Sequence, residues 1–404
     1  MIHSFTRMTS IVLAFGFFFG CTTLKNNSTQ QSPASFDELS AAQIKQRISS
    51  IDEQIDAQPK NRDLYLQKGT LLTKWAQQKS RPSKRTALYY KADKALSQAE
   101  LLSQSKDGIA TKNGIDQLRK VSWSSEHNQG VQLWQDTSTQ AEKRRAAIHF
   151  ENATAIMPDS STSYLMASRA FYDVGEFSKA IGELERARAN ISSVPLPLLE
   201  ALAFLYLDTD QPRQAVPVFK EALSANRPNY NLMHGLSNAY MKANEHSEAV
   251  MLLRRLTIKK PSNATYRCSL ASQLYLLAQN KTKAALKAPN SINSEFTALD
   301  SLLHEANDTF DYLLDKWEKN GDINAEAARY YQNAAGLYQK LLPHLNRSQK
   351  EKASNAIDQN LTAALPLMEV LASESDDKRW WQSLYQAYSI LGMQQKAKKA
   401  KSNL

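Results

Sequence analysis

Residues 199–222 read LEALAFLYLDTDQPRQAVPVFKEA, and residues 233–256 read MHGLSNAYMKANEHSEAVMLLRRL. In each segment an aromatic residue precedes an alanine by nine positions, and a large apolar residue follows that alanine by four. The pattern occurs once more upstream, so its alanines recur at intervals of 35 and 34 residues. The three sets are Phe171 with Ala180 and Leu184, Tyr206 with Ala215 and Phe219, and Tyr240 with Ala249 and Leu253. A fixed period of this size indicates an array of stacked helical hairpins.

The residue types at these positions have a packing reason. Small residues such as Ala203 and Ala215 let two helices approach closely, and aromatic residues such as Tyr206 and Phe219 fill the space beside them. Alanine and leucine are common, so one match alone would be weak. Three matches in register at a constant period are strong.

This pattern resembles the tetratricopeptide repeat, whose signature places large, small and aromatic residues in a first helix and Ala, Phe and Pro in and after a second. In the middle unit the matching residues are Leu199, Leu202, Ala203, Tyr206, Ala215, Phe219 and Ala222; in the next they are Met233, Leu236, Ser237, Tyr240, Ala249, Leu253 and Pro261. The resemblance implies an all-α fold, a right-handed α-solenoid of helical hairpins with divergent N- and C-terminal units.

The beginning of the chain reads as an export signal. Arg7 precedes a short apolar run at residues 11–19, which is too short for a membrane span of ~20 residues. Gly20 followed by Cys21 resembles a bacterial lipoprotein signal, so residues 1–20 are predicted to be removed and Cys21 to carry acyl chains. Residues 21–35 are polar without apolar periodicity and are predicted to form a tether. An ordinary signal peptide with an incidental cysteine is the alternative.

The remaining chain divides into four predicted parts. Residues 36–126 have helical but irregular periodicity, and residues 127–279 hold the repeat core. Residues 280–294 contain Pro289 with several Asn and Ser, which favours a loop insertion. Residues 295–404 are predicted to form longer amphipathic helices, a last repeat with Tyr388 and Ala397, and a polar cap.

Composition supports a large helical protein. Gly accounts for only 12 of 404 residues, which argues against turn-rich β-structure and phosphate-binding loops. The formal charge is +10 at pH 7, but acidic residues are interspersed with the basic ones, so solvated helix faces explain most of it. The functional alternative is attraction to anionic headgroups or an acidic partner. Nucleic acid is not expected as a partner, because no recognition motif is present.

The sequence shows little catalytic chemistry. His304-Glu305 lacks the second histidine of a zinc-binding helix, because position 308 is aspartate. No Gly-rich nucleotide loop, nucleophile elbow or Cys/His cluster is present. Cys21 and Cys268 are the only cysteines, and with Cys21 lipidated no disulfide is expected. We therefore expect no enzyme activity, no cofactor and no metal.

The resemblance also implies where a partner would bind. In this family the first helices line a concave groove, with ligand-facing residues at fixed positions between the packing ones. The candidate partner groove consists of Arg169, Tyr172, Glu200, Phe204, His234, Asn238 and Met241, with Leu165 and Leu207 at the remaining equivalent positions. For Phe204 and Met241, packing against a neighbouring helix is the alternative. The mixture of aromatic and polar side chains suits a peptide segment.

The leading hypothesis is a non-enzymatic scaffold lipoprotein of the outer membrane that faces the periplasm. It would bind an envelope protein during cell-wall, outer-membrane or secretion and pilus assembly, and a lipid at Cys21 would attach it to the membrane. The alternative is a helical lipoprotein that binds a small ligand or glycan; residues 280–294 contain no aromatic side chain, which counts against it. A third alternative is a homo-oligomer that associates through Trp317 or Trp380.

Overall fold

A computed structural model describes residues 39–103, 108–136, 139–224, 229–288, 291–375 and 377–404. In these ranges every regular element is helical, as the sequence predicts. The α-helices are α1 (Ala41–Ala57), α2 (Arg62–Gln77), α3 (Thr86–Leu101), α4 (Gly108–Asp136), α5 (Gln140–Ile156), α6 (Ser161–Asp173), α7 (Phe177–Asn190), α8 (Leu196–Asp208), α9 (Pro212–Ser224), α10 (Tyr230–Lys242), α11 (His246–Lys259), α12 (Ala264–Lys287), α13 (Ile292–Lys316), α14 (Gly321–Leu341), α15 (Arg347–Glu374), α16 (Lys378–Ile390) and α17 (Gln394–Lys401). Residues 1–35, with the predicted signal, Cys21 and tether, lie outside these ranges.

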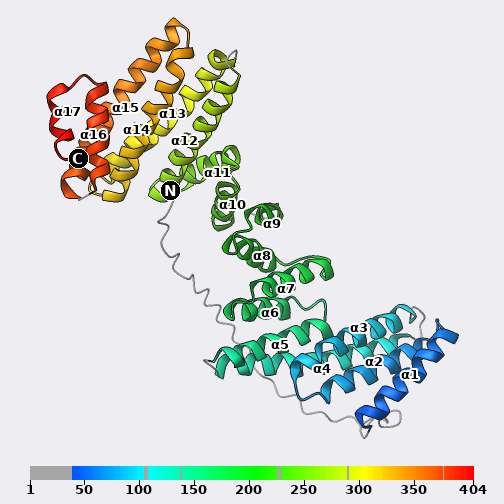
Figure 1. Cartoon of the computed structure of the whole chain (residues 1–404). Helices are drawn as coiled ribbons and strands as arrows, with labels where there is room; N and C mark the ends of the chain where they lie inside the picture. The colour runs from blue at the N-terminus through cyan, green and yellow to red at the C-terminus, as the bar shows by residue number, and fades with distance from the viewer. Residues whose placement is uncertain (1–38, 104–107, 137–138, 225–228, 289–290, 376) are drawn as a thin grey trace.

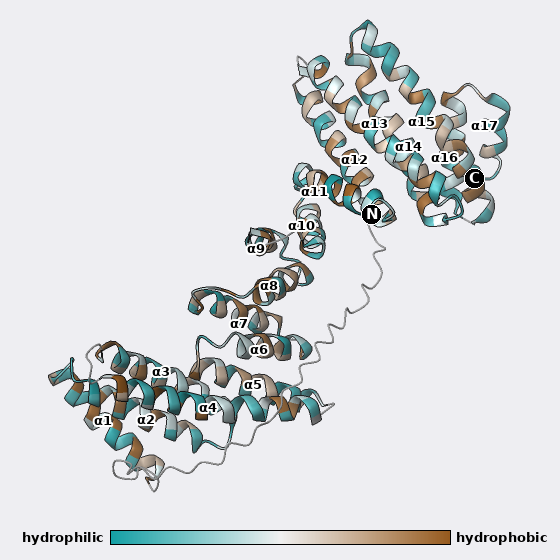
Figure 2. Cartoon of the chain, turned by 180° about the vertical axis from the view of Figure 1, so that it is seen from behind, coloured by the Kyte–Doolittle hydropathy of each residue, from teal (hydrophilic) through white to brown (hydrophobic). Residues whose placement is uncertain are grey.

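The helices form one elongated array (Figure 1). Six short helices, α6–α11, make a central stack of three hairpins between an N-terminal block, α1–α5, and a C-terminal block, α12–α17. Helices α1 and α17 lie at opposite ends. Hydrophobic and hydrophilic residues alternate along the helices of the array, as Figure 2 shows, and most of the buried residues are hydrophobic. The prediction of an all-α solenoid with divergent ends is confirmed.

The two helices of each repeat are joined by the same kind of turn. Gly175, Asp210, Asn244 and Gly392 all have positive φ, between 56° and 77°. Each lies five residues before the alanine that recurs in the second helix of its hairpin. The next backbone N–H bonds back to the carbonyl of the aromatic residue, as Gln211 does to Tyr206 at 2.7 Å and Met393 does to Tyr388 at 2.8 Å. This bond pattern closes a helix C-terminus and turns the chain into the second helix. Tyr388 and Ala397 therefore belong to a fourth hairpin with the same internal spacing and the same turn, as predicted.

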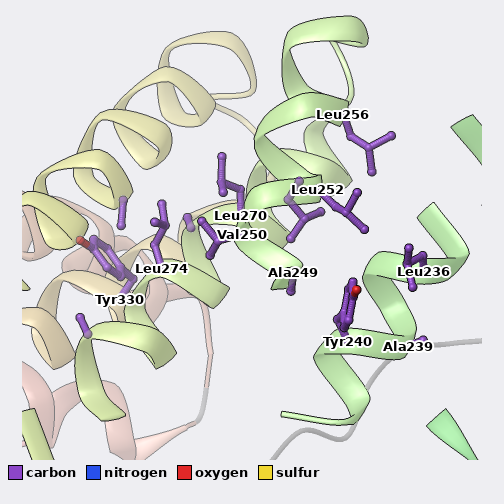
Figure 3. Packing of buried hydrophobic residues seen from close by; sticks show 14 of the residues in the cluster. Leu236, Ala239, Tyr240, Ala249, Val250, Leu252, Leu256, Leu270, Leu274 and Tyr330 are labelled. Atoms are coloured by element: carbon purple, nitrogen blue, oxygen red, sulfur yellow. The ribbon is translucent and has the colours of Figure 1, made fainter. Parts of the chain in front are cut away.

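One apolar core runs from α5 to α17 without interruption. The small residues sit at the helix crossings: Ala180, Ala215 and Ala249 are all fully buried. Figure 3 shows how the core continues from one repeat to the next, through Leu236 and Tyr240 of α10 to Leu270 of α12. Each hairpin buries its face only against its neighbours, so stability in this part comes from stacking.

The N-terminal block is held together differently, by three smaller apolar clusters and a buried polar network. Glu126 of α4 lies at the centre of the network and is almost fully buried. Arg85 donates to Glu126 Oε1 at 2.8 Å and Tyr89 at 2.9 Å, while His149 Nδ1 lies 2.7 Å from Oε2 and Asn152 donates to it at 3.1 Å. Burial alone would raise the pKa of Glu126, but these hydrogen bonds outweigh it and hold the pKa below its usual value.

The C-terminal block corrects one prediction. Residues 280–287 are not loop but the last two turns of α12, and only residues 288–291 separate α12 from α13. Ala278, Thr282 and Ala285 are buried at helical spacing, and Thr282 donates to the carbonyl of Ala278 at 2.9 Å. Burial of this face against α13 overrides the local preference of Asn and Ser for loops. The predicted long helices that follow are confirmed as α13 and α14.

The two tryptophans considered for self-association do not offer an exposed surface. Trp380 is only 8% exposed, and Arg329 covers its ring at 5.4 Å from the centroid. Trp317 is half-buried and packs against the core. None of the described helices is long and apolar enough to cross a membrane.

Candidate functional site

The candidate partner groove lies on three consecutive first helices. α6 carries Arg169 and Tyr172, α8 carries Glu200 and Phe204, and α10 carries His234, Asn238 and Met241. α6 packs against α8, and α8 packs against α10. The structure therefore places the seven predicted residues on three helices that pack against one another in order. Leu207, which the pattern also predicts to face the groove, is buried, because it packs into the core.

Arg169 is an exposed cation held in place by an aromatic platform. Its guanidinium lies 5.9 Å from the ring centroid of Trp134 on α4. Trp134 in turn packs its edge on the buried ring of Phe150, at 6.3 Å between centroids. No residue in the described ranges forms an ion pair with Arg169. A guanidinium that stacks on a fixed ring keeps its hydrogen-bond donors free for another group.

Tyr172 is 40% exposed and joins two repeats. Its hydroxyl donates to the carboxylate of Asp208 on α8, and its ring lies 5.3 Å from that of Phe177 on α7. The hydrogen bond to Asp208, together with partial burial, raises the pKa of Tyr172 to about 12. The side chain thus presents an apolar ring face beside an already satisfied hydroxyl.

Phe204 of α8 is also 40% exposed, and it lies where the α8–α9 hairpin contacts α10. One edge of its ring packs on Phe219 at 5.1 Å between centroids. A methyl group added at Gly235 of α10 would lie 2.5 Å from Phe219 and 3.0 Å from Phe204, so the glycine is needed for this close approach. Phe204 therefore both packs against its neighbours and leaves an aromatic face in solvent.

The polar residues of the groove have partners within their own repeat or in the next one. Asn229 donates to Glu200 at 3.0 Å, and burial raises the pKa of the Glu200 carboxyl although this hydrogen bond opposes the shift. His234 lies 5.1 Å, centroid to centroid, from Tyr266 of α12, and burial lowers its pKa. Asn238 lies 3.3 Å from His234 Nε2, to which its amide can donate.

Met241 is half-buried against the core. The packing alternative therefore describes Met241 well, whereas Phe204 packs on Phe219 and is still 40% exposed.

Trp134, on whose ring Arg169 lies, was not predicted to belong to the site. Trp134 lies 35 residues before Arg169, one repeat period upstream, and precedes the first complete repeat. The period itself was the signal that could have identified it.

Two places outside the groove hold side chains of types that catalytic sites use. Trp123 donates to Ser163 Oγ at 2.7 Å, and His127 Nδ1 lies 3.5 Å from the same oxygen. This serine is fully buried, so no substrate reaches it. Burial raises the pKa of the half-buried thiol of Cys268 to about 12, with help from Glu326, so at neutral pH it is a protonated, weak nucleophile. Across the described ranges no three His, Cys, Asp or Glu side chains gather as metal ligands.

Sequence comparison agrees with the geometry of the hairpins. A tetratricopeptide repeat family model matches residues 206–274, from the end of α8 to the middle of α12. Residues 206–274 thus match the tetratricopeptide repeat. The matched segment includes the third complete hairpin, α10–α11, and the groove residues on α10. No curated protein matches the chain in sequence.

Solved tetratricopeptide structures with a similar helical array are distant in sequence. YrrB, described as a protein with an unusual peptide-binding site, is 15% identical, has a TM-score of 0.36, and is matched over 48% of this chain and 86% of its own. A tetratricopeptide repeat protein from Parabacteroides merdae is 13% identical, with a TM-score of 0.34 over 70% of this chain and 100% of its own. PilF of Pseudomonas aeruginosa is 13% identical, with a TM-score of 0.34 over 63% and 99%.

Proposed function

We propose that this protein is a non-enzymatic scaffold of the bacterial cell envelope that binds a segment of a protein partner on the face formed by α6, α8 and α10. Tetratricopeptide repeats are protein-interaction modules, and partner binding is the function that this architecture supports. The observation that carries the proposal for this face is the exposure of Tyr172 and Phe204, at 40% each, on the first helices of two consecutive repeats. Exposed aromatic side chains flanked by polar groups are typical of binding surfaces.

The shape of the molecule favours a protein segment over a small ligand. One hollow among the described residues, of about 290 Å³, is open to solvent and lined by Asp210, Pro212, Lys242 and Asn244 among others. Sites for small molecules are enclosed and mostly apolar, and this one is neither. A long, shallow face across three hairpins fits an extended or helical segment better.

The envelope location rests on the sequence alone. A signal at residues 1–20 and a lipid at Cys21 would place the protein on the outer membrane, facing the periplasm, where the partner would belong to cell-wall, outer-membrane or secretion and pilus assembly. Fractionation of cells that express the full chain tests the anchor: Cys21→Ser should move the protein from the membrane to the soluble fraction.

Crosslinking in intact cells tests the binding face. We compare the wild type with Phe204→Arg combined with Asn238→Glu, and with a control that changes Arg213→Glu and Gln214→Glu on the exposed side of α9. A protein captured by the wild type and the control but not by the groove variant would support the proposal and name the pathway. Equal capture by all three would place the partner elsewhere and refute the α6–α8–α10 face.

A further inference from the structure

Three groove residues occupy the same position in three successive repeats. Phe204 follows Arg169 by 35 residues and Asn238 follows Phe204 by 34, which is the repeat period. They lie on α6, α8 and α10, the first helices that pack against one another in sequence. We call this set of Arg169, Phe204 and Asn238 the middle row. A ligand that runs along the groove meets a cation, then an aromatic ring, then an amide.

The cation in the middle row is available to a ligand. Other basic side chains on or beside this face are engaged: Lys242 of α10 lies 3.3 Å from Asp210, and Arg144 pairs with Glu176. The two acidic residues that α8 places on the face are also engaged, Glu200 by Asn229 and Asp208 by Tyr172. Arg169 rests on Trp134 without an acidic partner among the described residues.

The aromatic and amide members define the rest of the specificity. Phe204 makes a T-shaped contact with Phe219 and is 40% exposed, so the part of its ring in solvent can contact a large apolar side chain. Asn238 directs its amide nitrogen toward His234, so its carbonyl oxygen remains able to accept from a ligand N–H.

The spacing of the row sets the spacing of the ligand. Packed helices lie about 8–10 Å apart, and an extended chain advances about 3.3 Å per residue. Successive members of the row are therefore about three ligand residues apart. We propose that the groove selects an extended segment with an acidic side chain on Arg169 and a large apolar side chain on Phe204, about three positions away, with backbone contacts at Asn238.

This inference rests on the proposed function, since it names the chemistry of the partner segment for the same face. The occupant is an internal acidic and apolar protein segment. A free peptide C-terminus is disfavoured, because the family's lysine-rich and asparagine-rich clamp for a terminal carboxylate is not reproduced at these positions.

Selection from a random decapeptide library on the full chain, purified in detergent, tests the inference. We expect the wild type to enrich peptides in which Asp or Glu lies about three positions from Leu, Ile or Phe. With Arg169→Glu, the preference at that position should switch to Lys or Arg by about tenfold while the apolar preference remains. Arg213→Glu on α9 makes the same charge change outside the groove and should enrich the wild-type peptides.

The outcomes separate the inference from the function on which it rests. An acidic preference that persists in Arg169→Glu, or the absence of any charge preference, overturns the inference. If that happens while Phe204→Glu still abolishes the apolar preference, the groove binds segments but does not read their charge. If neither variant changes the selected peptides, or none is enriched, both the inference and the binding face are wrong.

Discussion

The N-terminal block and the central stack are both made of paired helices, yet different forces hold those helices together. In the central stack alanines and aromatic rings form one continuous apolar core, and the polar groups buried there, such as Ser237 and Glu183, are scattered along it. In the N-terminal block Glu126 gathers four hydrogen-bonding side chains between α3, α4 and α5. Shortening a side chain in an apolar core lowers stability in proportion to the volume lost. Removing any one member of a buried charge network leaves its partners without their hydrogen bonds.

The largest expected effect comes from breaking the network. Glu126→Ala should lower the free energy of unfolding of the N-terminal block by about 3–5 kcal/mol, because it leaves Arg85 without its buried partner. Hydrogen exchange followed by mass spectrometry should show faster exchange in α3, α4 and α5 and unchanged exchange in α14.

Phe219→Ala is the matched variant in the central stack, and a cavity of this kind costs about 3–5 kcal/mol as well. Its effect should appear in α8, α9 and α10, where the ring packs. If Glu126→Ala left the exchange of α3–α5 as it was, the network would not be what holds the block together.

A second prediction concerns the effect of pH on stability, to which two buried carboxyl groups contribute in opposite directions. Burial raises the pKa of Glu183 on α7 to about 7, despite the nearby Arg186. The unfolded chain then releases this proton at a lower pH than the folded one, so stability falls as pH rises from about 4.5 to about 7. For Glu126 the pKa is lowered, so its contribution is lost as pH falls through the acid range.

Urea unfolding of the wild type and of Glu183→Gln at pH 5 and pH 8 measures the Glu183 contribution. The wild type should lose on the order of 2 kcal/mol more than the variant between these values. The groups that face Glu183 are Arg186 on its own helix and Thr154 and Glu151 on α5, with Tyr90 and Tyr164 stacked on Arg186. Equal pH dependence in both proteins would contradict this prediction, because it would mean that Glu183 has the same pKa in the folded and the unfolded chain.

The smallest predicted effects concern the turns of the hairpins. Gly175→Ala and Asn244→Ala should each cost about 1 kcal/mol, because a β-carbon disfavours positive φ. Asn244→Gly should change stability by less than about 0.5 kcal/mol, since relief of strain is offset by greater freedom of the unfolded chain.

Gly182→Ala is the control for the turn variants, because it lies inside α7 with open space around its β-position and should gain about 0.5–1 kcal/mol. Thermal unfolding measures all four variants. A stabilising Gly175→Ala would mean that the turn relaxes to a different conformation.

The sequence predicted the regular part of the fold well because the period is local. An aromatic residue and an alanine nine positions apart identified all three complete hairpins and the one at Tyr388. The loop prediction for residues 280–294 was wrong because composition outweighed spacing: Asn and Ser suggested a loop, whereas Ala278, Thr282 and Ala285 already had the spacing of a buried helix face.

The candidate site was predictable only in part. Equivalent repeat positions identified Arg169, Phe204 and Asn238, and the structure places them on adjoining helices. The platform of Trp134 under Arg169 and the bond from Tyr172 to Asp208 join residues about one repeat apart, and the sequence does not say which side chains meet across that distance. The network around Glu126 joins residues up to 41 positions apart and has no sequence signature.

The change in helix length along the array has a mechanical consequence. α4 has 29 residues and α15 has 28, whereas the six helices of the central stack have 13 or 14 each. The middle of the molecule is thus its thinnest part, and thermal bending concentrates where the cross-section is smallest. A partner segment bound across α6, α8 and α10, as proposed, would contact all three hairpins of this thin part and would restrict its bending.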